Sequence, residues 1–127
     1  MTNHDAWLAQ VTEETIEPER PIVDPHHHLW LRNGYTYLMP ELADDLASGH
    51  NVVATVFAEC HSMYRQGGPE AERSLGETEF VTGQAAMSDS GGFGPTQACA
   101  VMFGNVDMTL GEGVEPLLER HIAASGG

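Results

Sequence analysis

The sequence predicts an α/β fold built on a parallel sheet. Three runs of apolar and β-branched residues are each followed by a segment whose apolar residues recur at helical spacing, and glycine or proline separates the segments. Such alternation places crossover helices between parallel strands, with right-handed connections. The 127 residues suffice for one domain or for a piece of a larger one.

The chain begins with a lead-in over residues 1–21. Trp7, Leu8 and Val11 stand at helical spacing, which predicts a short helix within residues 4–14. The prolines of residues 17–21 exclude a continued helix. We assign residues 22–127 to the α/β portion.

The first strand is expected over residues 22–28. A helix is expected over residues 37–48, because its leucines form a stripe, Pro40 suits a first helical turn and Gly49 suits the end.

The clearest strand is residues 51–60, a nearly continuous apolar run of the kind that is buried on both faces of a parallel sheet. A helix over residues 74–90, a strand over 98–104 and a helix over 112–125 follow. We therefore expect helices to cover the sheet. Three strands are few for such a sheet and the last helix ends at the end of the sequence, so we expect the chain to be part of a longer one.

The charge excludes two classes of partner. The formal charge is −14, from 19 acidic residues and five scattered arginines. Nucleic acids and anionic membrane surfaces require clustered positive charge, so neither is expected to bind. The sequence has no apolar stretch long enough to span a membrane. Residues 1–10 have no basic segment before an apolar one, so we do not expect a secretory signal. Cys60 and Cys99 form no metal- or redox-type pair, so we expect free thiols and a cytoplasmic protein.

The residues most suited to binding a metal ion lie in the segment Asp24-Pro25-His26-His27-His28. Side chains alternate along a strand, so Asp24, His26 and His28 should share one face. Two imidazoles at this spacing can bind one metal ion, and Asp24 can orient them. The carboxyl end of a parallel strand is where sites are built in α/β folds. A surface cluster of histidines without a metal is the alternative reading.

Further polar residues follow the second strand. Glu59, His61, Tyr64 and Arg65 are candidates for the substrate site, with His61 as a third metal ligand or a substrate contact and Arg65 as a partner for a substrate carboxylate. An exposed loop histidine and a surface salt bridge are the alternatives. Glu77 and Glu79 open the predicted helix, and its dipole is a sufficient explanation for at least one of them.

The segment Ile22-Val23-Asp24-Pro25-His26-His27-His28-Leu29-Trp30 resembles the first-strand D-x-H-x-H motif of the amidohydrolase superfamily. It is most similar to amidohydrolase family 2, which includes aminocarboxymuconate-semialdehyde decarboxylase and the pyrone-dicarboxylate lactonases. The segments NVVATVFAECHSMYR, GETEFVTGQAAMS and GGFGP are also similar to this group.

The resemblance implies a (β/α)₈ (TIM) barrel with one or two divalent metals, of which this chain would supply the N-terminal part. It implies that His26 and His28 bind the metal, zinc before manganese or iron. The remaining histidine ligands and the aspartate that acts as general base have no counterpart before Gly127, so the catalytic residue is unknown and a chain of this length should be inactive alone.

The resulting hypothesis is a metal-dependent hydrolase that cleaves C–O or C–N bonds of a small molecule, with carboxylated substrates implied by relatives. One alternative is a non-catalytic remnant that binds a partner or forms a homo-oligomer through exposed strand edges. The other is a metal-dependent decarboxylase on the same scaffold.

Overall fold

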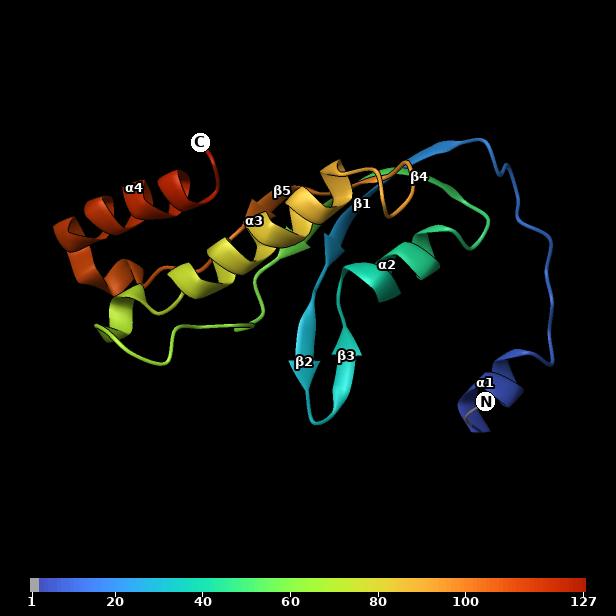
Figure 1. The fold of residues 1–127 in the computed structure, drawn as a ribbon, viewed down its shortest axis with the longest axis horizontal. Coiled ribbons are helices and arrows are strands. Elements are labelled where there is room, and N and C mark those ends of the chain that lie inside the picture. The colour runs from blue at the N-terminus through green and yellow to red at the C-terminus, as the bar shows by residue number, and fades with distance from the viewer. Residues whose placement is uncertain (1–2) are drawn as a thin grey trace.

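The computed structural model describes residues 3–127 (Figure 1). Its elements in chain order are α1 (Asn3–Leu8), β1 (Pro21–His27), β2 (Trp30–Arg32), β3 (Tyr35–Tyr37), α2 (Met39–Leu46), β4 (Asn51–Ala58), η1 (Glu70–Glu72), α3 (Leu75–Asp89), β5 (Gln97–Phe103), η2 (Met108–Gly113) and α4 (Val114–Ala124). No helix in residues 3–127 has the length and apolar character that crossing a bilayer requires.

The main sheet confirms the predicted α/β class. Its strand order is β1-β4-β5, and both neighbouring pairs are parallel. The three predicted strands correspond to these elements, and the predicted helices over residues 74–90 and 112–125 correspond to α3 and α4. The carboxyl ends of all three strands therefore meet at one edge of the sheet, where sites of α/β proteins form.

A hairpin that we did not predict follows β1. Strands β2 and β3 pair antiparallel through Asn33-Gly34, whose φ angles are +51° and +78°. Asn-Gly is the pair most typical of such turns because both residues tolerate positive φ. The hairpin projects from the end of β1 (Figure 1). Because β3 occupies Tyr35–Tyr37, α2 begins at Met39 and not at residue 37.

The lead-in also differs from prediction. Helix α1 ends at Leu8, short of the expected residue 14, and none of its residues is buried. Trp7 and Val11 are exposed, so no packing holds a longer helix. An isolated helix of this length gains little from its own hydrogen bonds.

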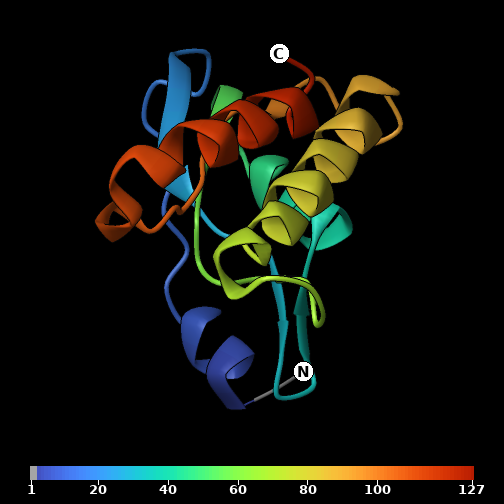
Figure 2. The same ribbon diagram turned by 90° about the vertical axis from the view of Figure 1, so that its left-hand side faces the viewer.

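The core lies on one face of the sheet, under α2 and α3. It consists of Leu29, Met39, Leu42, Phe57, Val81, Ala98 and Cys99. Helix α3 runs along β5, and α4 packs beside α3 (Figures 1 and 2). Burial of these apolar side chains supplies the main favourable free energy of folding.

The opposite face of the sheet is open, whereas the sequence led us to expect that helices cover the sheet. Val23, Val101 and Phe103 are 56%, 60% and 49% exposed. Val101 and Phe103 are in register with Val56 and Ala58 of β4, so this face continues across the two strands. The sequence pattern shows that these strands are apolar, but it does not determine whether helices cover one face of the sheet or both.

Candidate metal centre at the carboxyl end of the sheet

The imidazoles of His26 and His28 converge at the exit of β1. Their Nε2 atoms lie 3.3 Å apart, and the ring planes are nearly perpendicular, at 89°. His26 is exposed and His28 is half-buried. The ring of His26 also lies edge-on to Phe103, 6.2 Å between centroids, on the open face of the sheet. The predicted convergence of the two histidines is therefore present.

The orientation of His28 is set by β4. Its Nδ1 lies 2.9 Å from the carbonyl oxygen of Ala58. A carbonyl oxygen only accepts, so Nδ1–H donates and the neutral ring carries its lone pair on Nε2. Trp30 stacks on the same ring, 5.7 Å between centroids. The lone pair of His28 is thereby directed at His26.

Asp24 lies elsewhere than predicted. The register of β1 against β4 is irregular between Asp24 and His27, and Asp24 is in register with buried Thr55. Its carboxylate accepts a hydrogen bond of 3.0 Å from the backbone N–H of His26. Among the described residues, Asp24 therefore supports the backbone of the pair and contacts neither imidazole. A strand irregularity breaks the period-two alternation on which the prediction depended.

His27 points to the opposite, buried side, as predicted from alternation. Its Nε2 lies 2.8 Å from Oγ1 of Thr55, and its ring is edge-on to Phe57. Burial lowers the pKa of His27, because the charged imidazolium loses its hydration in the core. His27 is thus a core residue and is separate from the candidate centre.

The His26–His28 separation fits a bound metal ion. With zinc–nitrogen bonds of about 2.05 Å and tetrahedral angles of about 109°, two nitrogens on one ion lie about 3.3 Å apart. The separation of 3.3 Å between the His26 and His28 Nε2 atoms matches this value. No third histidine, cysteine or carboxylate joins the pair within residues 3–127. The described residues therefore offer two ligands of a centre, and His61 is not a third.

The loop after β4 holds the other candidates at the same end of the sheet. His61 is exposed and stacks on Tyr64, 4.7 Å between centroids, and its Nδ1 is 3.6 Å from Oε2 of Glu59. The Tyr64 hydroxyl accepts a hydrogen bond of 3.3 Å from the Asn105 amide. Burial raises the pKa of Tyr64. These residues form one cluster, distinct from the His26–His28 pair.

Arg65 is not free for a substrate. Its guanidinium pairs with the carboxylate of Glu79 on α3. This is the surface salt bridge that stood as the alternative to a substrate contact. A ligand carboxylate would have to compete with Glu79 for the same donors.

The sequence interpretation missed the role of Glu77. This residue is 3% exposed, and its Oε2 accepts from the backbone N–H groups of Cys60 and Ser62. The helix dipole accounts for at least one of the two acids, and nothing in the sequence separates Glu77 from exposed Glu79. Only the return of the β4–α3 loop onto the first turn of α3 reveals the contact.

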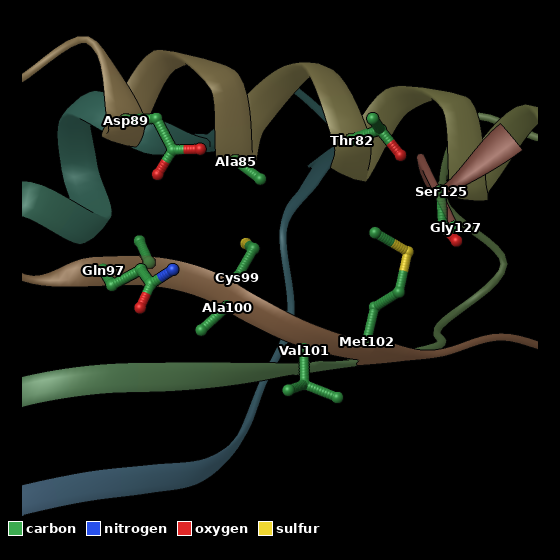
Figure 3. A pocket seen from close by; sticks show the side chains of 11 residues that line it. Thr82, Ala85, Asp89, Gln97, Cys99, Ala100, Val101, Met102, Ser125 and Gly127 are labelled. Carbon is green, nitrogen blue, oxygen red and sulfur yellow. The ribbon is translucent and has the colours of Figure 1, made fainter. Parts of the chain in front are cut away.

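The hollows in the described part of the chain include two near the sheet. One, of about 420 Å³, runs along the free edge of β5 beneath α3, where Thr82 and Ala85 face Cys99 and Met102 (Figure 3). The other lies at the carboxyl end of the sheet between the loops after β4 and β5, and Tyr64 and Asn105 are in its lining.

Comparisons with models of protein families, with curated proteins and with solved structures found no match.

Proposed function

We propose that this chain is the N-terminal part of a metal-dependent hydrolase of the amidohydrolase-related type, with a (β/α)₈ barrel as its complete fold. The observation that carries the proposal is the convergence of the His26 and His28 Nε2 atoms to 3.3 Å at the carboxyl end of a parallel strand. The resemblance of residues 22–30 to the first-strand motif of that superfamily supports it. Of zinc, manganese and iron, zinc is the one that we expect these two imidazoles to bind.

The residues of this chain would hold and orient the metal. His28 is fixed by the Ala58 carbonyl, while His26 has no second hydrogen bond from its ring within residues 3–127 and can adjust. A bound metal supplies hydroxide at neutral pH by lowering the pKa of its water. Tyr64, His61 and Glu59 lie at the same end of the sheet. In a (β/α)₈ barrel, the loops at that end select the substrate.

A non-catalytic module that forms homo-oligomers is the second candidate. The exposed apolar side chains of Val23, Val101 and Phe103 on the open sheet face favour it. Such a face lowers its free energy when it is covered, whether by further chain or by another copy.

Metal binding tests the first proposal. Zinc titrated into the protein should shift the imidazole resonances of His26 and His28 in NMR spectra, and His26→Gln and His28→Gln should each weaken binding at least about tenfold. His50→Gln is the matched control, because His50 is exposed and precedes β4 at the other end of the sheet. Equal zinc affinity in all four proteins would contradict the proposal.

Turnover tests the expectation of inactivity. We expect this chain with zinc or manganese to hydrolyse lactones and amides no faster than the free metal does. Turnover above that level that is lost in His26→Gln would show that these 127 residues suffice for catalysis.

A further inference from the structure

The loop that leaves β4 begins in a strained conformation. His61 and Met63 have φ angles of +61° and +56°, in the left-handed region that non-glycine residues rarely adopt. Such strain persists only where surrounding contacts determine it, and it clusters at functional sites. The strained pair flanks Ser62, which is buried. Some contact must therefore hold this turn in place.

Glu77 makes that contact. Its Oε2 accepts hydrogen bonds of 3.0 Å from the Cys60 N–H and 2.6 Å from the Ser62 N–H, the two amides on either side of His61. Hydrogen bonds to a carboxylate are roughly twice as strong as neutral ones. The other oxygen, Oε1, is buried without a hydrogen-bond partner among residues 3–127. Burial of a carboxylate in this way is costly, and a helix dipole alone does not explain it.

The first turn of α3 also packs closely against the loop after β4, at Gly76. A Cβ atom at Gly76 would lie 2.8 Å from the backbone nitrogen of Arg65 and closer still to the Met63 carbonyl oxygen. The Arg65 N–H also donates to the Arg73 carbonyl, at 2.9 Å. The loop therefore packs closely against Gly76 of α3, in addition to the hydrogen bonds that it donates to Glu77.

The segment that Glu77 holds is continuous with the support of the histidine pair. Ala58, whose carbonyl orients His28, lies two residues before Cys60. The Cys60 carbonyl accepts from the Arg32 guanidinium, and Arg32 lies over the ring of Trp30, which stacks on His28. Displacement of Cys60 would therefore disturb both contacts that orient the His28 ring.

We propose that Glu77 is a positioning residue of the candidate metal centre, holding the Cys60–Met63 turn so that the Ala58 carbonyl keeps His28 in its Nδ1–H tautomer. This inference rests on the proposed function, because the orientation of His28 affects the candidate centre only through metal binding by His28. The positioning itself is a property of the metal-free protein.

The test compares Glu77→Ala and Glu77→Gln with wild type in ¹⁵N NMR spectra without metal. Glutamine keeps an accepting oxygen but loses the charge, whereas alanine loses both. Glu79→Ala is the matched control, since Glu79 lies on the same helix, is exposed and pairs with Arg65, which lies beyond the Cys60–Met63 turn. The imidazole ¹⁵N shifts report the His28 tautomer, and the amide proton shifts of Cys60 and Ser62 report their hydrogen bonds.

We expect wild type, Glu77→Gln and Glu79→Ala to hold His28 as Nδ1–H, and Glu77→Ala to show a mixture of tautomers. Zinc affinity should fall about 10- to 100-fold in Glu77→Ala and by less than about threefold in Glu77→Gln. Should the alanine variant not fold, the glutamine variant still decides, because its Cys60 and Ser62 amide protons should move upfield as the charged acceptor is lost.

Two results would overturn the inference: unchanged amide shifts in Glu77→Gln, or a folded Glu77→Ala that keeps the wild-type His28 tautomer. Wild-type protein that shows the predicted tautomer and amide shifts but binds no zinc would instead overturn the proposed function and leave the positioning contact standing.

Discussion

At the scale of single residues, buried polar contacts join strands of the sheet. Thr55 is fully buried, and its Oγ1 accepts from the Cys99 backbone N–H at 2.9 Å while lying 2.8 Å from Nε2 of His27. One hydroxyl thus connects β1, β4 and β5. Burial raises the pKa of the Cys99 thiol to about 12, so this cysteine stays protonated at neutral pH and acts as a core residue.

Thr55→Val should lower the free energy of unfolding by about 1–3 kcal/mol. Valine keeps the shape but leaves the Cys99 N–H and the His27 ring without their partner in the core. Urea denaturation measures the change. Thr36→Val, on exposed β3, is the control and should change stability by less than about 0.5 kcal/mol. Equal effects in the two variants would contradict the role of Thr55.

His121 should make stability depend on pH. Its Nδ1 and Nε2 lie 2.8 Å from Thr78 Oγ1 and 3.2 Å from Ser74 Oγ, and burial lowers its pKa below 6.5, with nearby Arg120 acting in the same direction. A histidine with a lowered pKa binds its proton more readily in the unfolded chain, so its contribution is present above pH 6.5 and is lost as pH falls.

Urea denaturation between pH 7.5 and pH 5 checks this expectation in wild type and His121→Gln. Wild type should lose stability relative to the variant as the pH falls through 6.5. Parallel pH curves for the two proteins would show that His121 does not contribute. His50→Gln is a control, because that histidine is exposed.

At the scale of elements, helix α3 contacts the β4–α3 loop with its first turn and the core with its middle. Its first turn seats the β4–α3 loop through Gly76 and Glu77, and its middle packs Val81 into the core above the sheet. Glycine makes a helix interior less stable than alanine does. A glycine there therefore indicates either that another segment packs too closely for a side chain or that nothing constrains the residue type.

The two glycines of α3 should respond in opposite ways to alanine. Gly76→Ala should destabilise by about 1–3 kcal/mol, because the new Cβ would overlap the backbone of Met63 and Arg65. Gly83→Ala should stabilise by about 0.5–1 kcal/mol, since nothing lies within 4 Å of its Cβ position and alanine is the better helix former. Thermal denaturation of both variants checks the difference in sign.

At the scale of the whole molecule, the open face of the sheet is the dominant feature. Helices cover one side, while apolar side chains of β1 and β5 remain exposed on the other, beside His26. Such a face favours covering by further polypeptide or by a second copy. The net charge of −14 opposes association of two copies at low salt.

The Val23→Thr, Val101→Thr double variant should therefore reduce self-association. We expect wild type to associate as its concentration and the salt concentration rise, because screening weakens the repulsion between copies. Sedimentation velocity measures the effect. Val11→Thr, Ile16→Thr is the control, because both residues are exposed in the lead-in away from the sheet. Wild type that stays monomeric at high salt and high concentration would exclude the oligomeric alternative.

The order of strands and helices and the convergence of His26 and His28 could be predicted from the sequence, because apolar periodicity and the alternation of side chains are local properties. Even the missed β2–β3 hairpin carried a local signal in Asn33-Gly34. The tertiary structure decided the rest. Four features depend on contacts between segments that are distant in the chain. They are the irregularity of β1 at Asp24, the pairing of Arg65 with Glu79, the hydrogen bond from the Cys60 N–H to Glu77 and the uncovered face of the sheet. Such contacts depend on how packed elements meet in space, which no local pattern encodes.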